Sequence, residues 1–376
     1  MKKKAVAKIL SAALVGVLAL GLAACGNKEA STSNGSTASE TKSDIKVGIV
    51  VKTSTNAHFQ DIAYGAALAG KELGVEVLID NTATEADIDG QITKCEDMIT
   101  KGVDALILTA NDSKGVATAV EAAHDADVKF VTVDTEIDNV WGDSVSEYMP
   151  NYIGVDHTIM AYEMTKDICE KMGGEGNVVI LRGVDAASSS QERTAGIEAA
   201  IAEYPNVTIV ESQSAQYDQT TAQTTLGDIL QAKKDVDAVI CCNDLMAVGA
   251  VNALKENNYE VGGDNGVIVA GIDGNIIALE SIEAGEMYCT AYDWSLLQGY
   301  YAVQQAVALV KGEEVPAYTF TADTVITAEN VAEFLPHGQE LAKWTMGSAL
   351  TDVSDDMYAF LDKGLALPVS ETKQAH

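Results

Sequence analysis

Short apolar runs alternate with amphipathic stretches along the chain from residue 45 onward. The runs are rich in Val and Ile and lie at 46–51, 75–80, 105–109, 130–134, 152–156, 178–182, 207–212, 238–243, 267–273 and 289–293. Continuous apolar runs of this length predict parallel strands that are covered on both faces. Between them, apolar residues recur with helical spacing at 59–73, 88–100, 116–126, 160–172, 197–204, 245–255 and 296–311.

This order of elements predicts an α/β protein with two lobes. Repeated strand–helix–strand units with right-handed crossovers build open, doubly wound parallel sheets. The strands fall into two series, so we expect two similar sheets rather than one. A length of 376 residues suits two domains of ordinary size, and 47% hydrophobic residues supply enough apolar material for two cores.

The first 24 residues have the features of an export signal. Lysines at 2, 3, 4 and 8 precede an apolar run at 9–22, which is shorter than the ~20 residues of a membrane span. The run ends in Leu22-Ala23-Ala24-Cys25, and small residues before a cysteine resemble the lipobox of bacterial lipoproteins. That resemblance implies cleavage before Cys25 and acylation of its thiol. The alternative is an ordinary signal peptide with a chance cysteine.

Residues 25–44 consist mainly of small and polar residues, without a large apolar side chain. Such a stretch cannot bury enough surface to become ordered, so it predicts a flexible tether. A tether behind an acylated cysteine would hold the protein at the outer face of the cytoplasmic membrane, whether that face is extracellular or periplasmic.

Charge and cysteine content exclude several other classes. The net charge of −32 argues against nucleic-acid binding, which needs a basic surface. Apart from Cys25 there are five cysteines without a CxxC spacing, which suits neither a disulfide framework nor a zinc site, although one disulfide among them stays open. The five histidines show no metal-ligand spacing, so we predict no metal and no cofactor.

The motifs of common catalytic chemistry are also missing. The first strand is followed by KTSTN at 52–56, without the glycine-rich turn of a dinucleotide site, and neither HExxH nor GxSxG occurs. Polar residues gather instead at the carboxyl ends of the predicted strands, where open α/β sheets bind ligands. We therefore expect a binding protein and not an enzyme. An exported enzyme acting on a sugar is a rival without motif support.

Six segments carry a family resemblance: TNAHF at 55–59, KGVDALIL at 101–108, VTVD at 131–134, QERTAG at 191–196, AVICCNDLMAVGA at 238–250 and VAGIDG at 269–274. Their order and spacing resemble the periplasmic sugar-binding proteins of the ribose and galactose type, which serve ATP-driven importers. The resemblance runs from about residue 45 to about 330. It implies two doubly wound lobes joined by a three-segment hinge, with the ligand cleft between them.

Domain boundaries follow from the same resemblance. The N-terminal lobe is expected at 45–155 plus 294–323, and the C-terminal lobe at 156–293 plus 324–340. Residues 341–376 form a C-terminal extension that departs from the family, as does an insertion around 139–151. The sequence assigns neither of them a role.

The resemblance also implies the ligand-binding residues, which are Asn56, His58, Phe59, Asp134, His157, Arg193, Tyr217, Asn243, Asp273 and Asp293. Carboxylates accept hydrogen bonds from sugar hydroxyls, Arg donates them and Asn does both, while aromatic rings pack on the apolar face of a sugar. The ribose binders have an aromatic residue, Asn and Arg where this chain has His58, Thr109 and Thr135. These departures argue against ribose itself.

These observations predict a monomeric, extracytoplasmic solute-binding lipoprotein. It would capture a sugar or sugar-like polyol by hinge closure and deliver it to the membrane permease of an ATP-driven importer. The alternative is a sensor subunit that presents a sugar or signalling molecule to a membrane receptor. The sequence leaves the identity of the sugar open.

Overall fold

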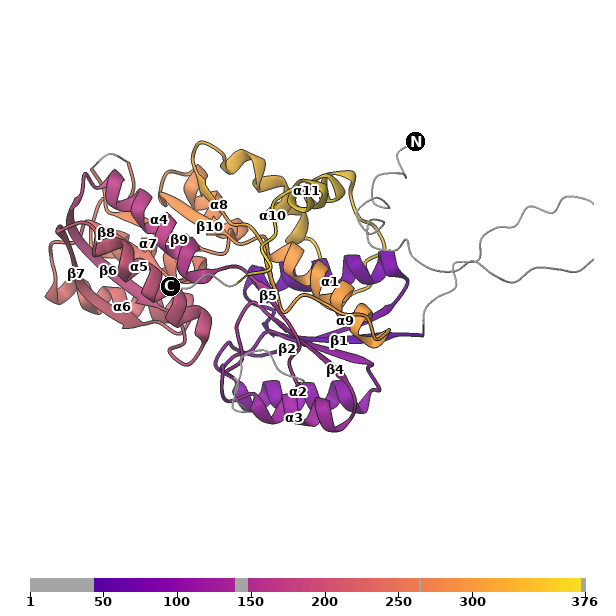
Figure 1. Cartoon of the computed structure of the whole chain (residues 1–376). Coiled ribbons are helices and arrows are strands. Elements are labelled where there is room, and N and C mark those ends of the chain that lie inside the picture. Colours follow the sequence, from indigo (N-terminus) through magenta and orange to yellow (C-terminus); the bar gives the residue numbers. More distant parts are fainter. Residues whose placement is uncertain (1–43, 139–147, 264, 373–376) are drawn as a thin grey trace, which may run out of the picture. The chain divides into compact units, whose positions relative to one another are not determined.

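A computed structural model describes residues 44–138, 148–263 and 265–372. The predicted signal peptide at 1–24, Cys25 and nearly all of the tether lie outside these residues, as does most of the insertion at 139–151. The described part confirms the predicted fold class, because it contains two sheets with helices packed against them (Figure 1).

The first sheet is entirely parallel and has the order β2–β1–β3–β4–β5–β11. Its strands are β1 (Lys46–Thr53), β2 (Glu76–Thr82), β3 (Ala105–Leu108), β4 (Lys129–Val133), β5 (Tyr152–Gly154) and β11 (Tyr318–Phe320). Burial is almost complete in β1 and complete in β3, as expected for strands that are covered on both faces.

The second sheet has the matching order β7–β6–β8–β9–β10–β12, and only β12 runs antiparallel. Its strands are β6 (Glu175–Arg182), β7 (Asn206–Ser214), β8 (Ala238–Cys241), β9 (Ile268–Ile272), β10 (Cys289–Tyr292) and β12 (Thr324–Thr327). Each predicted strand is present. The short edge strands β11 and β12 are additions that the apolar pattern does not indicate.

Helices connect the strands in both halves. They are α1 (Ala57–Leu73), α2 (Ile88–Thr100), α3 (Ala117–Asp125), α4 (His157–Lys171), α5 (Ser188–Ile201), α6 (Gln219–Ala232), α7 (Asp244–Glu256), α8 (Ile276–Glu283) and α9 (Ser295–Val310). The bounds predicted for the helix at 197–204 are wrong, because α5 begins at Ser188. Its first turns consist of serines and charged residues, so only its second half shows apolar periodicity.

After β10 the chain returns to the first sheet through helix α9. This helix crosses α1 at close range. A Cβ on Gly65 would lie 1.9 Å from the Leu296 carbonyl oxygen, and one on Gly299 would lie 1.8 Å from the Ile62 carbonyl oxygen. Only glycine permits this approach of two backbones. Within the described residues the chain therefore passes between the sheets after β5, after β10 and after β11.

The C-terminal segment, defined as residues 328–372, covers the second of these crossings. It contains the short 3-10 helix η2 (Val331–Glu333), α10 (Leu335–Leu341) and α11 (Asp355–Leu365). Helix α10 contacts both α1 and α8, and α11 contacts α9. An isolated bridge between Phe320 and Ser370 then joins the segment to β11. The extension thus packs on the body at the hinge.

An aromatic cluster fills the space beneath this segment. It consists of Tyr292, Trp294, Phe334, His337 and Phe360, and we call it the hinge cluster. The Phe360 ring stacks on Trp294, with a centroid distance of 5.0 Å, and on His337, with a distance of 3.9 Å. Trp294 is 1% exposed, and its indole N–H donates to Thr324 Oγ1 over 3.1 Å. Trp294 is therefore part of the hinge and not of the cleft.

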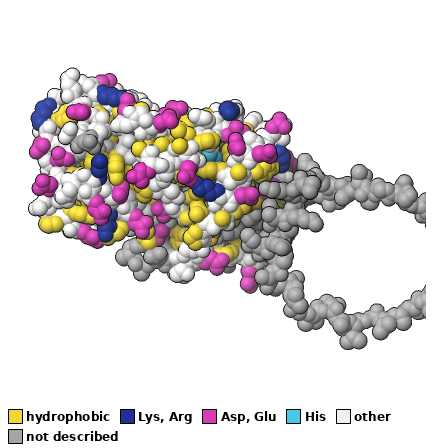
Figure 2. Space-filling model, turned by 90° about the horizontal axis from the view of Figure 1, so that it is seen from above, with side chains coloured by type: hydrophobic (Ala, Val, Ile, Leu, Met, Phe, Trp, Pro, Cys, Tyr) yellow, Lys and Arg dark blue, Asp and Glu magenta, His cyan; other side chains and the backbone are white. Residues whose placement is uncertain are grey.

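The described cysteines, at 95, 169, 241, 242 and 289, are buried free thiols. In the part of the chain that the structure describes, none of the helices has both the length and the hydrophobicity required to span a bilayer. Acidic side chains are scattered over the visible face and do not gather in one patch (Figure 2). Their distribution fits a well-solvated surface.

Candidate ligand-binding site

A cavity of about 10 Å³ lies between the two sheets, at the carboxyl ends of their strands. It is lined by Lys52, Asn56, His58, Phe59, Glu85 and Asp134 from the first half, and by Ser189, Arg193, Tyr217, Asn243 and Asp273 from the second. A cavity of this volume holds about one water molecule. Binding of a larger ligand therefore requires the side chains that line the cavity to move apart.

The halves of the protein touch directly at the rim of this cavity. The Ser113 amide donates to the Ala186 carbonyl over 3.2 Å, and the Ser188 amide donates to Ser113 Oγ over 2.9 Å. Thr135 Oγ1 also lies 3.1 Å from Ser189 Oγ. These bonds join loops of the first half to the start of α5, so the structure shows the two halves closed on one another.

Strand ends and helix starts place the polar lining residues. Asp134 directly follows β4 and Asp273 directly follows β9. Asn56 caps α1 by accepting from the His58 amide over 3.1 Å, and Asn243 caps α7 by accepting from the Met246 amide over 3.0 Å. The Asn56 NH₂ also donates to Glu85 Oε1 over 3.1 Å and to Asp273 Oδ2 over 3.4 Å, and the Asn243 NH₂ donates to the Tyr217 carbonyl oxygen over 3.5 Å. A ligand would compete with these bonds for the two amide groups.

Backbone strain coincides with the cavity. Asp134, Tyr217 and Asp273 have φ angles of 63°, 59° and 127°. Positive φ is uncommon for residues other than glycine, and especially for a bulky residue such as tyrosine. Such strain costs of order 1–3 kcal/mol per residue and tends to occur where function requires a special side-chain direction.

Charged side chains of both signs meet in the cavity wall. His58 Nε2 lies 3.1 Å from Asp134 Oδ1, and Arg193 Nη1 lies 3.3 Å from Asp273 Oδ1. Lys52 Nζ approaches Asp134 Oδ2 to 3.7 Å. All five side chains are at most 3% exposed. Buried charges are stable only when they are paired, so the removal of one partner would destabilise the charge of the other.

These pairs shift the pKa values of their members. Burial by itself would lower the pKa of His58, but the carboxylates of Asp293, Asp273 and Asp134 raise it to about 10. Burial would raise the pKa of Asp134, yet the hydrogen bond from His58 and the charge of Lys52 hold it well below its usual range. His58 is therefore an imidazolium and Asp134 a carboxylate at neutral pH.

Two carboxyl groups shift in the opposite direction. Burial raises the pKa of Glu85 to about 7 and that of Asp293 to about 6, although neighbouring cations pull both values down. Neither oxygen of Asp293 has a hydrogen-bond partner among the described residues. Within the described residues, its carboxylate forms ion pairs with His58 Nδ1 at 3.6 Å and with Arg193 Nη2 at 3.9 Å.

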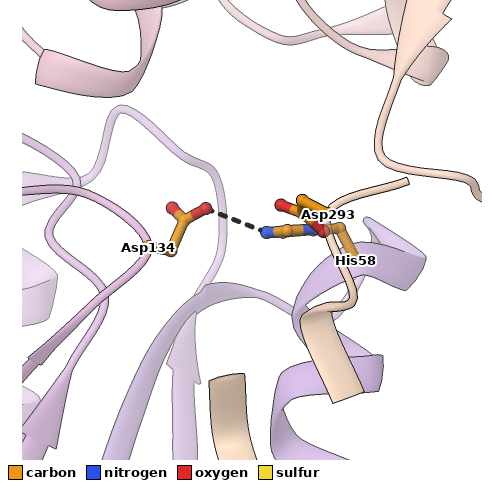
Figure 3. A group of neighbouring side chains, drawn as sticks. All are labelled: His58, Asp134 and Asp293. Carbon is orange, nitrogen blue, oxygen red and sulfur yellow. Dashed lines mark hydrogen bonds and ion pairs between the residues drawn. The ribbon is translucent and has the colours of Figure 1, made fainter. Parts of the chain in front are cut away.

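His58, Asp134 and Asp293 are close enough to resemble a metal site, since one ligand atom from each lies within 4.8 Å of the others (Figure 3). The imidazole, however, stands between the two carboxylates and directs Nε2 at Asp134 and Nδ1 at Asp293. A doubly protonated ring already supplies the positive charge. Lys52 and Arg193, within 4 Å of these carboxylates, would also repel a metal ion.

Eight of the predicted ligand residues line the cavity, whereas His157 and Asp293 lie just behind it. His157 Nε2 lies 2.8 Å from the Asp134 carbonyl oxygen, and His157 Nδ1 accepts from Arg193 Nε over 3.2 Å. Burial and the charge of Arg193 lower the pKa of His157 to about 3, so the ring is neutral. Its contacts hold Arg193 in position.

Sequence reasoning missed Lys52, Glu85 and Ser189. Lys52 belongs to the buried strand β1, and Glu85 lies in the loop after β2. A lysine in an apolar strand and a glutamate just after the end of the neighbouring strand are signals that the strand-end rule could have used. Ser189 lies in the polar first turn of α5, whose start the apolar pattern does not locate.

Comparisons with known proteins identify the class. The profile of the family described as periplasmic binding protein domain matches residues 47–314. The chain belongs to this family, whose members are binding proteins of importers and not enzymes. It also matches the ribose import binding protein of Bacillus subtilis with 30% identity over 281 residues, which cover 73% of this chain and 84% of that protein.

Two further relatives extend the comparison. The xylitol-binding protein of Mycolicibacterium smegmatis is 27% identical over 334 residues, covering 88% of each chain. The crystal structure of an ABC transporter periplasmic solute-binding protein from Actinobacillus succinogenes with bound D-allose matches with a TM-score of 0.71 and 29% identity. That match covers 77% of this chain and 99% of the other.

Proposed function

We propose that this protein captures a sugar or sugar-like polyol between its two lobes and delivers it to an ATP-driven importer. The observation that carries the proposal is the cavity at the strand ends, where carboxylates, a guanidinium and amides from both lobes face one small space. A sugar hydroxyl donates and accepts hydrogen bonds, so it satisfies such a mixed set. The ribose, xylitol and D-allose named for the three relatives are all polyhydroxylated.

Each wall residue has a distinct task in this proposal. Asp134 and Asp273 accept from ligand hydroxyls, Arg193 donates to them, and the side-chain amides of Asn56 and Asn243 can donate and accept. Phe59 and Tyr217 pack on the apolar face of the ligand, and the strained backbone at Tyr217 aims its ring into the cavity. Asp293 sits behind this wall at the hinge.

Hinge closure provides the mechanism. A ligand that binds residues of both lobes stabilises the closed arrangement, in which the rim bonds of Ser113 and Thr135 form. Closure also removes water from the charged wall and thereby strengthens each hydrogen bond to the ligand. The expected lobes are 45–155 plus 294–323 and 156–293 plus 324–340, and the permease would recognise their closed surface.

Membrane attachment through Cys25 completes the proposal. Acylation after an export signal would keep the binding lobes near the permease, with 25–44 as the tether. Incorporation of labelled palmitate into the wild-type protein, but not into a Cys25→Ser variant, is the expected result. Equal labelling of both proteins would refute the anchor without affecting the binding site.

The test of binding is calorimetric titration of the mature chain, from residue 25 onward, with a panel of sugars, polyols, amino acids and nucleosides. We expect one sugar or polyol to bind with a Kd near the micromolar range, or about −8 kcal/mol. Arg193→Gln should abolish this binding. The control Arg182→Gln, whose side chain pairs with Asp185 outside the cavity, should preserve it. Binding only to an amino acid or nucleoside would refute the sugar assignment.

A further inference from the structure

The C-terminal segment gives the molecule one more connection between its two halves. It follows β12, a strand of the second sheet, and contacts the first sheet again near its end. There Phe320 of β11 and Ser370 exchange two backbone hydrogen bonds, with N···O distances of 2.8 and 3.1 Å. Within the described residues, the chain therefore crosses the hinge after β12 as well as after β5, β10 and β11.

The first half holds this segment along helix α1. His337 Nε2 lies 3.1 Å from Asp61 Oδ1 on that helix. The Trp344 ring meets Tyr64 edge to face, with a centroid distance of 5.3 Å. Residues three apart lie on one face of a helix, so Asp61 and Tyr64 offer the segment one continuous surface. The segment is therefore bound to α1 at successive points.

The Asp61 carboxylate connects the segment with both halves. Its Oδ2 accepts from the Tyr292 hydroxyl, at the end of β10, and from Ser295 Oγ, at the start of α9, each over 2.7 Å. Burial by itself would raise the pKa of Asp61, but the charge of His337 and these hydrogen bonds hold it below its usual value. A buried carboxylate is costly without such partners, so Asp61 favours the arrangement in which all these contacts form.

Helix α10 of the segment also binds the second half, and it does so without slack. It packs against α8 as well as against α1. A Cβ on Gly338 would lie 3.1 and 3.2 Å from two side-chain carbons of Ile276, so the backbone of α10 rests directly on α8. His337 and Gly338 are neighbours in this helix. Helix α10 therefore contacts the first half and the second half at adjacent residues.

Opening of the cleft must break some of these contacts. Helices α1 and α8 belong to different halves, and a groove of about 200 Å³ is lined by both of them and by α10. Thr55 and Gln60 line it from the first half, Asn275 from the second and Leu341 from α10. A rotation that separates the halves widens this groove. Because a helix has a fixed rise of about 1.5 Å per residue, α10 cannot lengthen to follow and must leave one of the two sides.

We propose that the C-terminal segment is a strap that holds the two lobes closed and thereby slows both the entry and the release of the ligand. The inference rests on the proposed function for its ligand but not for the closed state itself. Asp61, Tyr64 and Ile276 lie outside the ligand cavity, so the strap favours closure equally with and without ligand. Where the closed state dominates in both cases, loosening the strap raises both rates by the same factor and leaves the affinity nearly unchanged.

The first experiment measures closure of the mature chain without ligand. Spin labels on Asp125→Cys in the first lobe and Asp185→Cys in the second, at side chains that are 86% and 57% exposed, report the distance between the lobes by double electron–electron resonance. Cys25→Ser removes the cysteine before the tether, and the cysteines among the described residues are buried. With the native strap, we expect mainly one closed population. A mostly open population would overturn the inference.

Two variants loosen the strap from opposite sides. Gly338→Leu pushes α10 away from Ile276, and Trp344→Ala removes the ring that packs on Tyr64. Each should raise the ratio of open to closed molecules about 10-fold or more. Gly227→Leu in α6, where an added Cβ meets nothing within 4 Å, is the matched control and should leave the ratio unchanged. Unchanged ratios in both strap variants, with far-ultraviolet circular dichroism verifying that they are folded, would refute the strap.

Stopped-flow binding of the sugar or polyol that calorimetry identifies supplies the second readout. Both strap variants should increase the association and dissociation rate constants together, by about 10-fold, and keep Kd within about fivefold of the wild type. A rise in the dissociation rate constant alone would contradict the strap, because it would indicate a weakened binding site. Absence of binding by every sugar and polyol would refute the proposed function, while the distances measured without ligand would still decide for or against the strap.

Discussion

The cleft and the hinge cluster are buried to a similar extent but differ in their side chains. The cleft contains several charged groups, including the carboxylate of Asp293, which has no hydrogen-bond partner among the described residues. The hinge cluster consists mainly of stacked aromatic rings; the N–H of Trp294 donates to Thr324, and His337 Nε2 lies 3.1 Å from Asp61 Oδ1. Burial of apolar rings stabilises the fold, whereas burial of incompletely paired charges costs stability.

The difference suggests that the hinge cluster contributes mainly to stability and the cleft mainly to ligand binding. The hinge cluster packs the C-terminal segment against Trp294 at the crossing after β10, and Trp294 in turn contacts Thr324 at the start of β12. In the proposed function, a ligand would supply partners to the cleft groups that lack them. Mutations in the two regions should therefore separate stability from binding, and the following predictions test this separation.

Removal of the central ring of the hinge cluster should have the largest effect. Phe360→Ala deletes the ring that stacks on both Trp294 and His337 and should lower the free energy of unfolding by about 3–5 kcal/mol. Ligand affinity should stay within about fivefold. Urea unfolding and calorimetry check the two values. A large loss of affinity without a loss of stability would contradict the division between the regions.

Neutralisation of a cleft carboxylate should give the reverse result. Asp273→Asn keeps the shape of the side chain but removes the charge that faces Arg193, and we expect ligand binding to weaken by about 2–4 kcal/mol. The free energy of unfolding should change by less than about 1 kcal/mol. Asp228→Asn, on the exposed face of α6, is the control. Unchanged affinity of Asp273→Asn would refute the proposed site.

The pH dependence of stability should reveal the cost of the buried Glu85. The folded protein keeps this proton up to about pH 7, whereas the unfolded chain loses it near pH 4.5. The folded state therefore binds more protons in this window, and the contribution of Glu85 to the free energy of unfolding falls as the pH rises through it.

Glu85→Gln removes that contribution to the pH dependence. The rise in pKa from 4.5 to about 7 corresponds to about 3 kcal/mol, so the variant should be more stable than the wild type by up to this amount at pH 8. The two proteins should differ little at pH 4. Denaturant unfolding at both pH values measures the effect. A variant that is less stable at pH 8 would show that Glu85 stabilises the fold.

The packing of α11 on Trp294 gives the smallest predicted change. A Cβ on Gly364 would lie 2.7 Å from the indole ring, so Gly364→Ala should destabilise the protein by about 1–2 kcal/mol despite the better helix propensity of alanine. Gly227→Ala in α6, where the added Cβ meets nothing within 4 Å, should be neutral or stabilising by up to about 1 kcal/mol. Equal effects of the two substitutions would argue against tight packing at the hinge cluster.

Much of the cavity could be predicted because its residues directly follow local signals. Asp134 and Asp273 come at the end of apolar runs, and the carboxyl ends of parallel strands share one edge of a sheet. The resemblance to sugar-binding proteins added Arg193 and Tyr217, which no strand-end rule would find. The structure brings these residues together at one cavity, while their role in binding stays a proposal.

For Lys52 and Glu85, the sequence indicates the position at a strand end but not the surroundings of the side chain. The apolar neighbours of Lys52 mark a strand, but the pattern does not show that its ammonium extends between Phe59 and Tyr217, which belong to different lobes. Glu85 lies in a loop, where position depends on the path of the chain. Most of the insertion around 139–151 lies outside the described residues, so its role stays open.

The sequence by itself determined the order of strands and helices, the division into two sheets and the polar strand ends. These properties depend on the spacing of apolar residues and on neighbours along the chain. Only the tertiary structure decided how His58 bridges Asp134 and Asp293, where Lys52 directs its charge, and how the C-terminal segment covers Trp294. Coulomb interactions and ring packing act between residues that are distant in the chain, so their outcome depends on distances that arise only after folding.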